Sequence, residues 1–427
     1  MATAVNLIRN SRIFFTTNVD SYGRIKIGAY KDGTSPMNSG LVSGTANCWE
    51  LQVLEGLTFS QNTTQDTITL NEAGATPSRG QRSFNTALQP LDFSFSTYIR
   101  PYKNGSTDPV TAEERVLWNA FAGNATLASG TNWTETGTST TDTGVTYTNG
   151  TAKLNFLNSN KHQLLPFGLI ILFDNAAYCL DNCALDTATV DFGIDAIGTI
   201  AWAGKGSSIR PLTDIAASAY VDSVTSITFS GTDASGTTPD PADTAYPKNV
   251  NGRYITNKLS TMILNDGIAD YTNSSTTFPS YSVALTGGQI VFNNNLTYLT
   301  PANLATVNLP ITYFTGTRAI TGNVTAYLKT GTTSETAALL KDMLAAAPST
   351  PDPKYTINIQ MGGPTSNSTG VEFKLPSAML QIPQINTAQV ISTTINFTAQ
   401  GNDGAGNYAI TAQNEATIVY RSAPASA

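Results

Sequence analysis

The sequence predicts a mainly β protein with short helices, built as two tandem domains related by internal duplication. Three observations lead to this prediction. Short segments alternate between apolar and polar residues, Thr and Asn are abundant, and two stretches of the first half align without gaps on two stretches of the second. β-Branched Thr favours strands and Asn favours turns, so the composition fits a chain rich in both.

The duplication appears when the chain is aligned with itself. Ile171–Val190 falls on Val371–Val390, and Thr67–Tyr98 falls on Leu296–Tyr327. The two blocks keep the same order in each half. Self-similarity of this kind indicates that one structural unit occurs twice.

The aligned blocks also indicate where the domains lie. We expect one domain at residues 1–215 and a second at residues 216–427, with the boundary between Leu212 and Tyr220. A Thr/Gly-rich insertion at about 124–151 accounts for most of the difference in spacing between the two blocks. The insertion is expected to be a loop or a hairpin of the first domain.

The first strand block of each half alternates with period two. Leu91–Tyr98 and its repeat counterpart, residues 320–327, are each expected to form a strand with one apolar and one polar face. The apolar faces carry Phe93, Phe95, Val324 and Ala326, which we expect in the core. The polar faces carry Asp92, Ser94, Ser96, Thr321, Asn323 and Thr325.

A short amphipathic helix is expected after each of these strands. In the first half, Thr111–Glu114 has the pattern of a capping box, and Gly123 is placed to end the helix. The apolar stripes are Val116, Leu117, Ala120 and Phe121 in the first half, and Leu339, Leu340, Met343 and Leu344 in the second. Such stripes pack on a core.

A second strand block closes each half. In the first half, Val190, Phe192 and Ile194 alternate with Asp191, Gly193 and Asp195. Asp191 and Asp195 would therefore extend the polar face. The alternation has opposite parity in the two halves when Val190 is aligned with Val390, and a one-residue bulge would reconcile them.

Charge excludes one large class of function. Only 12% of the 427 residues are charged, the formal net charge is −7, and no run of Lys or Arg occurs. Tight nucleic-acid binding needs clustered basic residues, so the chain is not expected to hold DNA or RNA. Its many neutral hydroxyl and amide groups suit interfaces between chains, because they hydrogen-bond without burying charge.

No catalytic, cofactor or metal site is expected. His162 is the single histidine, and one histidine cannot build a metal site. A catalytic triad would depend entirely on the same residue. The three cysteines, Cys48, Cys179 and Cys183, fit neither a disulfide framework nor a zinc site, and we expect buried thiols in a reducing compartment.

Membrane insertion is not expected either. The N-terminal residues 1–6 lack the basic region and apolar run of a secretory signal. The most apolar stretch, Leu164–Phe173, is too short to span a bilayer.

Several stretches, in order over most of the chain, resemble one known family. They are Leu7–Phe14, Thr67–Gly74 with Arg79–Gly80, Ser94–Ile99 with Pro101–Lys103, Asn293–Pro301, Phe314–Gly316 and Thr325–Leu328. Together they resemble the major tail tube proteins of long-tailed, non-contractile bacteriophages of the T-five type. Each short string is weakly specific, and the specificity comes from their number and order.

The resemblance implies a structural virion protein without enzymatic activity. Each half would be one tube domain, a β-sandwich with a flanking helix that contributes strands to a shared inner barrel. Three chains would form a pseudo-hexameric ring, and rings would stack into a hollow tube. The tube would enclose the tape-measure protein, meet tail completion and tip proteins at its ends, and pass double-stranded DNA without binding it specifically. It would belong to the virion tail and be assembled in the cytoplasm of the host bacterium.

In such a tube the polar strand faces would line the lumen and form a neutral to acidic wall. The residues expected there are Asp92, Ser94, Ser96, Thr321, Asn323, Thr325, Asp191 and Asp195. A wall of this charge would repel DNA phosphate weakly and keep transit fast.

Two other interpretations stay open. One is a different virion structural protein, such as a capsid decoration protein or a baseplate hub component. The other is a carbohydrate-binding β-sandwich module that uses Trp49, Trp133 and Trp202 as stacking platforms. A hydrolase fits least, because histidines and a recognisable nucleophile motif are lacking.

Overall fold

The computed structural model is mainly β, which confirms the predicted fold class. It describes residues 12–17, 19–25, 48–68, 82–103, 105–123, 133–142, 145–156, 164–173, 177–211, 254–266, 280–283, 285–302, 307–331, 335–348, 355–363, 368–382, 384–387, 390–401 and 415–423. The expected domain boundary at Leu212–Tyr220 and His162 lie outside these residues.

The first half contains sixteen strands and one α-helix in its described part. They are β1 (Arg12–Thr16), β2 (Cys48–Leu51), β3 (Thr58–Ser60), β4 (Thr63–Ile68), β5 (Arg82–Leu88), β6 (Leu91–Tyr98), β7 (Pro101–Tyr102), β8 (Thr111–Ala112), α2 (Arg115–Ala122), β9 (Trp133–Glu135), β10 (Thr140–Asp142), β11 (Val145–Tyr147), β12 (Ala152–Asn155), β13 (Phe167–Leu172), β14 (Ala177–Asp191), β15 (Thr199–Gly206) and β16 (Ser208–Pro211).

The described part of the second half follows a similar order. Its elements are the 3-10 helix η4 (Asn257–Leu259), β17 (Thr261–Asp266), β18 (Ser280–Val283), β19 (Leu285–Asn293), β20 (Leu296–Leu299), β21 (Thr312–Thr315), β22 (Ala319–Tyr327), α4 (Thr336–Ala346), β23 (Tyr355–Gly362), β24 (Gly370–Leu380), β25 (Gln384–Thr387), β26 (Ile391–Ala399) and β27 (Thr417–Arg421). No helix in the described ranges is long and apolar enough to cross a membrane.

The order of paired strands is the same in both halves. In the first half, antiparallel pairing runs β2–β1–β13–β14–β15–β6–β3. In the second half it runs β18–β17–β23–β24–β26–β22–β19. In addition, β16 lies beside β14, and β27 lies beside β24. The two halves therefore share one strand topology.

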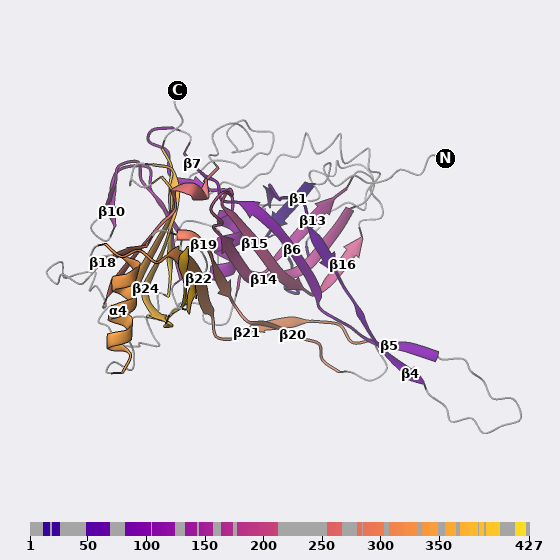
Figure 1. Ribbon diagram of the computed structural model, residues 1–427. Helices are drawn as coiled ribbons and strands as arrows, with labels where there is room; N and C mark the ends of the chain where they lie inside the picture. Colours follow the sequence, from indigo (N-terminus) through magenta and orange to yellow (C-terminus); the bar gives the residue numbers. More distant parts are fainter. Residues whose placement is uncertain are drawn as a thin grey trace, which may run out of the picture.

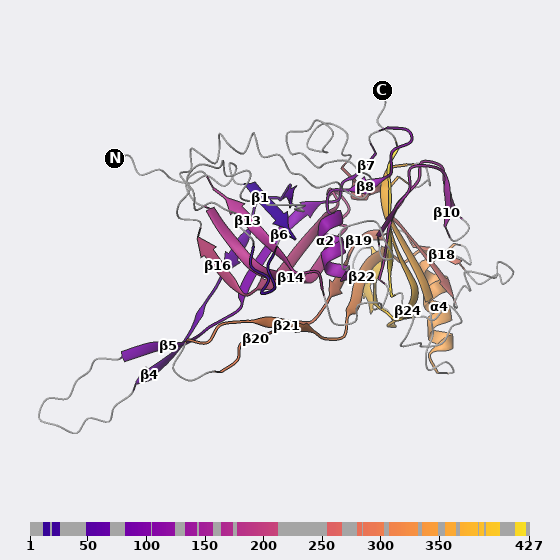
Figure 2. The same ribbon diagram turned by 180° about the vertical axis from the view of Figure 1, so that it is seen from behind.

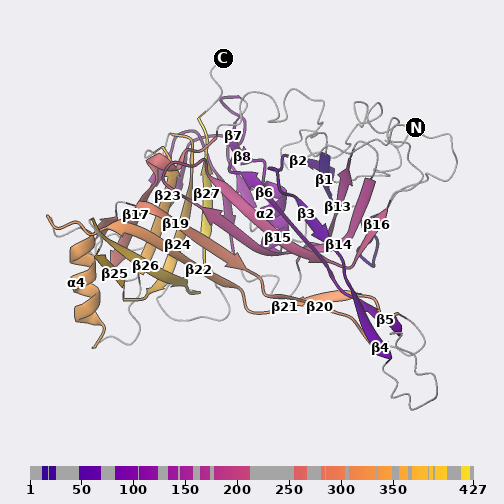
Figure 3. The ribbon, with the colours of Figure 1, turned by 45° about the vertical axis from the view of Figure 1, so that its right-hand side comes forward.

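The two halves are joined edge to edge through β14 and β19. These strands pair antiparallel from Thr187 opposite Asn293 to Asp191 opposite Gln289. Figures 1 and 3 show the strands of the first half continuing through β19 into those of the second. A second link forms where β27 pairs with β12, which follows the insertion of the first half. Nineteen of the described strands, drawn from both halves, thus belong to one large sheet, and the other eight form four two-stranded pairs: β4–β5, β7–β8, β10–β11 and β20–β21.

Strand pairing corrects the sequence alignment of the second block. Val190 lies opposite Ile200, which lies opposite Thr97. In the second half Ile385 lies opposite Thr393, which lies opposite Ala326, the repeat counterpart of Thr97. Val190 therefore corresponds to Ile385 and not to Val390. The ungapped alignment was wrong by an odd number of residues, which reverses the face of every side chain and explains the disagreement in parity.

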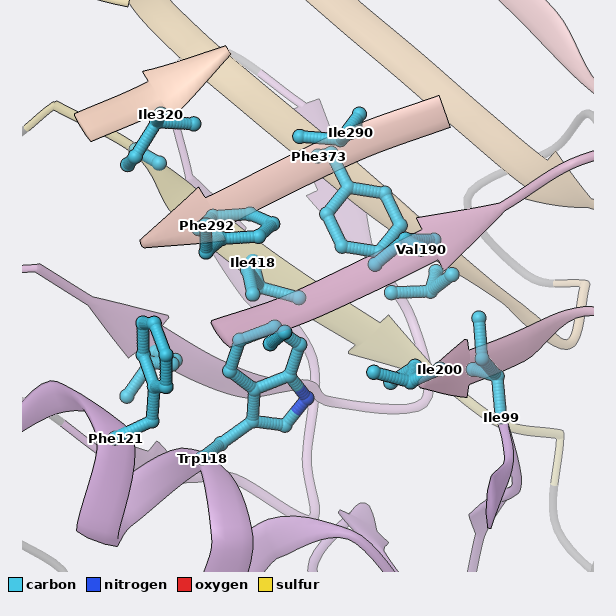
Figure 4. Close-up of a cluster of buried hydrophobic side chains, with 14 of the residues drawn as sticks. Ile99, Trp118, Phe121, Val190, Ile200, Ile290, Phe292, Ile320, Phe373 and Ile418 are labelled. Atoms are coloured by element: carbon cyan, nitrogen blue, oxygen red, sulfur yellow. The ribbon is translucent and has the colours of Figure 1, made fainter. Parts of the chain in front are cut away.

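Helix α2 lies beneath the junction of the two halves (Figure 2). All eight of its residues are buried. Figure 4 shows Trp118 and Phe121 of α2 pointing toward Phe292 of β19, with ring centroids 5.3 and 6.4 Å away. Asn294, just after β19, donates from its side-chain amide to the carbonyl oxygens of Phe121 and Leu185. The core is thus continuous between the halves.

The helix predictions were confirmed in part. Gly123 ends α2 in the left-handed conformation, with φ of 77°. The prediction of a capping box at Thr111–Glu114 was wrong. Thr111 lies in β8, opposite Tyr102, and the helix begins only at Arg115. In α4, Leu339 and Met343 are buried as expected, but Leu344 is 51% exposed.

Two hairpins leave the body of the sheet. The β4–β5 hairpin extends away from both halves, and β20–β21 runs toward its base (Figure 1). They meet where Asn308 accepts a hydrogen bond from the amide of Leu88 at 2.8 Å. The insertion of the first half also forms a hairpin, β10–β11, rather than a plain loop.

Candidate functional surface: one polar face across the joined sheet

Residues from both halves form continuous rows across the joined sheet. One row, in order of pairing, is Ser96, Ala201, Thr189, Val291, Thr321 and Thr398. The next is Tyr98, Thr199, Asp191, Gln289, Asn323 and Asn396. Directly paired residues point to the same side of a sheet. The structure therefore brings Asp191 and the six polar residues of β6 and β22 to one side of the sheet, which we call the polar face.

The opposite side of the same strands is core. Phe93 and Phe95 are each 3% exposed, and Val324 and Ala326 are fully buried. Burial along β6 and β22 alternates as the sequence predicts, apart from Gly322. One sheet thus has an apolar side packed on the core and a polar side of mostly neutral hydroxyl and amide groups.

The charged residues of the polar face include an ion pair. Lys205 Nζ of β15 lies 2.7 Å from Asp92 Oδ1 of β6, and both side chains are partly exposed. The hydroxyl groups of Thr58 and Ser94 are hydrogen-bonded beside this pair, at 2.7 Å. Lys205 belongs to this face but was not among the predicted residues, although the alternation in residues 199–205 was the available signal. The charge of Asp92 is therefore balanced locally, whereas Asp191, farther along the face, has no cationic partner among the described residues.

Asp195 is not part of the polar face. Strand β14 ends at Asp191, and the Asp191 carboxylate accepts a hydrogen bond from the amide of Gly193 to start a turn. Asp195 lies in that turn, 3.4 Å from Lys258 Nζ, and Ile194 is 45% exposed. The predicted alternation beyond Phe192 was wrong, because this turn directs the chain into β15.

A buried charged cluster links the two halves behind the sheet. Glu113 lies 2.7 Å from the Arg100 guanidinium, and Trp118 Nε1 donates to the hydroxyl of Tyr420 on β27. Burial raises the pKa of Glu113 to about 7, although the adjacent Arg100 lowers it. Burial also raises the pKa of Glu114 to about 7, with hydrogen bonds, including one to Tyr420, acting in the opposite direction. The cluster holds the C-terminal strand against α2.

The structure places Cys179, Cys183, Trp133 and Trp202 in the core. The thiols of Cys179 and Cys183 are buried, and burial raises the pKa of Cys179 to about 12. Trp133 and Trp202 are buried, so they offer no surface for a sugar ring to stack on. Within the described ranges, no group of three or more His, Cys, Asp or Glu residues could hold a metal ion.

Comparison with known proteins gives the family of the chain. No family model matches the sequence. The chain is 30% identical over 406 residues to "Tail tube protein pb6" of Escherichia phage T5, a match that covers 94% of this chain and 74% of the relative. Identity at this level over nearly the whole chain shows common descent and agrees with the β-rich fold. The chain belongs to the T5-like family of phage tail tube proteins.

Proposed function

We propose that the chain is the major tail tube subunit of its phage. Three copies form a ring of six similar domains, and rings stack into a hollow tube in the virion tail. The observation that carries this proposal is the β14–β19 junction, where two units of one topology already join edge to edge within a single chain. We place the domain boundary at residues 215 and 216.

A ring follows from the physical chemistry of such units. A sheet with open edges recruits further strands, and closing it into a barrel removes the edges. A head-to-tail contact between identical copies closes when its rotation divides the circle. A chain that supplies two of six equivalent positions needs three copies for closure.

The polar face is the surface that we assign to the lumen. It comprises Asp92, Ser94, Ser96, Asp191, Thr321, Asn323 and Thr325. Asp195 is left out because it lies in the turn after β14. Its side chains are mainly neutral and its ion pair is internally balanced, so it offers DNA phosphate few cationic partners. Such a wall fits a conduit through which double-stranded DNA moves without specific binding.

The role implies defined partners. The tube encloses the tape-measure protein before DNA passes, and its ends meet tail completion and tip proteins. Assembly takes place in the cytoplasm of the host bacterium, before the tail joins the virion. The contribution of the chain is structural and not enzymatic.

Native mass spectrometry of the smallest rings tests the stoichiometry. We expect assemblies that contain multiples of three chains, and electron microscopy of the same sample should show rings or tubes. A minimal ring of six chains would refute the three-chain ring. A sample that stays monomeric under all assembly conditions would refute the tube role.

A further inference from the structure

The two outermost strands of the polar face are β3 at one side and β25 at the other. Among the described strands, β3 pairs with β6 alone and β25 pairs with β26 alone. Each therefore has one edge whose backbone N–H and C=O groups have no described strand beside them. Edges of this kind are templates for pairing with another chain.

These two edge strands are the repeat counterparts of the strands that meet inside the chain. Ile385 of β25 corresponds to Val190 of β14, as the pairing registers show. Phe59 lies opposite Phe93, and Ile290 lies opposite Gly322, the repeat counterpart of Phe93. Phe59 of β3 therefore corresponds to Ile290 of β19.

Burial differs sharply between the counterparts. Val190 and Ile290 lie opposite each other in the junction, and both are fully buried. Ile385 is 44% exposed, and Phe59 is only partly buried. Three further residues around β25 are large, apolar and exposed: Ile382, Val390 and Ile391. Exposed apolar side chains gathered at one open strand edge mark an interaction surface.

We propose that β25 of one copy pairs antiparallel with β3 of the next copy and so closes the ring. The β14–β19 register, transferred to the outer edges, places Ile385 opposite Phe59 of the next copy, Asn386 opposite Thr58 and Gln384 opposite Ser60. This inference rests on the proposed tube function and names the surface by which the copies join. The occupant is a second copy of this chain, because β3 is the one described strand that repeats the position of β19.

The chemistry of the two edges is compatible. Thr58, Ser60 and Asn386 are neutral and exposed, so no like charges face each other. Ile385 and Phe59 point to the apolar side, where Phe59 already contacts the ring of Tyr178 at 5.7 Å. The contact is head to tail, because its two surfaces differ, and such contacts form rings when they close.

Cysteine cross-linking tests the register. The double variant Thr58→Cys with Asn386→Cys places two thiols at directly opposed positions, within the reach of a disulfide. We expect oxidised assemblies of this variant to give covalent species between chains on non-reducing gels, in a ladder that ends at three chains. The matched control, Ser96→Cys with Asn386→Cys, has both thiols on the polar face but one of them on β6, away from the edge, and should stay monomeric on the gel.

Two results would overturn the pairing. One is a Thr58→Cys/Asn386→Cys variant that forms tubes without any disulfide between chains, and the other is equal cross-linking of the control. If the variant does not assemble, hydrogen exchange of the wild-type chain decides, since amides of β3 and β25 should exchange more slowly in tubes than in free chains. Unchanged exchange in wild-type tubes refutes the pairing and leaves the tube function standing, whereas a wild-type chain that forms no rings refutes both.

Discussion

The two halves of the chain share a strand order but differ in what covers their equivalent edges. In the first half, the C-terminal part of β14 is covered by β19. In the second, β25 occupies the equivalent position and no described strand covers it. One such edge is therefore paired inside the chain, and among the described strands its repeat counterparts β25 and β3 each keep one open edge. The β14–β19 junction inside the chain is therefore the model for the proposed contact between β25 and β3 of neighbouring copies.

The helices show the same asymmetry. Helix α2 packs on β14 and is wholly buried beneath the junction, whereas α4 packs on β18. Phe121 of α2 is fully buried, while Leu344, its expected counterpart in α4, is half exposed. Of the two helices, only α2 lies beneath the junction with the other half, and only α2 is fully buried.

The largest expected effect comes from the same substitution at the two counterpart positions. Val190→Asp places a carboxylate without a partner in the joined core, which costs several kcal/mol and should prevent folding. Ile385→Asp should leave the free chain folded, with a melting temperature within a few degrees of wild type, and should abolish rings and tubes. Circular dichroism and electron microscopy provide the two measurements.

Ile263→Asp is the matched control for this comparison. Ile263 is 36% exposed on β17, away from the proposed ring contact. This variant should both fold and assemble. If Ile385→Asp formed tubes at the wild-type critical concentration, β25 would not be part of the contact between copies.

The second comparison concerns the two helices. Phe121→Ala removes a fully buried ring and should lower the free energy of unfolding by about 3–5 kcal/mol. Leu344→Ala removes a half-exposed side chain and should change it by about 0.5 kcal/mol or less in the free chain. Urea denaturation measures both values. Equal losses would show that α4 is as deeply packed as α2 in solution.

Features encoded by neighbouring residues could be predicted from the sequence, whereas the pairing of strands far apart in the chain could not. The alternation in β6 and β22 is local, so it gave the correct core residues and the correct polar face. Gly123 was found because a helix end needs a residue that tolerates positive φ. The β14–β19 pairing was not found, because it joins residues about a hundred positions apart and leaves no local signal.

Two errors have a common origin in strand pairing. The alignment of Val190 with Val390 maximised local similarity, but the sheet sets its register through partners on both sides of each strand. Thr111 had the sequence of a helix cap, yet pairing with Tyr102 keeps it extended. Local propensity was overridden in both places by contacts that the sequence does not display.

The third prediction uses the charged cluster that holds β27 against α2. The pKa of Glu114 is about 7 when folded, against about 4.3 in an unfolded chain. Its contribution to stability is complete below about pH 4.3 and is lost as the pH rises toward 7, because only the unfolded chain releases the proton in this window. Glu114→Gln should therefore make the fall in melting temperature between pH 5 and 7 less steep, and the fall that remains comes from Glu113, whose pKa is also raised to about 7.

Glu55→Gln makes the same chemical change at an exposed site and should keep the wild-type pH dependence. The expected difference between the two variants is on the order of 1–3 kcal/mol across the window. Identical pH profiles would mean that Glu114 is not buried in the solution structure. The second half offers no equivalent, since Glu335 before α4 is only partly buried.

The smallest expected effect concerns transport along the polar face. Asp92→Lys with Asp191→Lys replaces two exposed carboxylates by ammonium groups and leaves Lys205 without its partner. We expect tubes to form as before, because neither residue lies in a packed contact, and DNA release from phage carrying the variant to slow several-fold at low salt. The added cations would hold phosphate, and the effect should fade at high ionic strength, where the screening length shortens. Asp195→Lys is the single-site control: it replaces one carboxylate by an ammonium group in the turn outside the polar face, where the double variant replaces two on that face, and it should leave release unchanged. Equal release rates for the double variant and wild type at low salt would show that the charge of this face does not govern DNA passage. If Asp195→Lys also slowed DNA release, the conduit wall would include the turn after β14 as well as the strands.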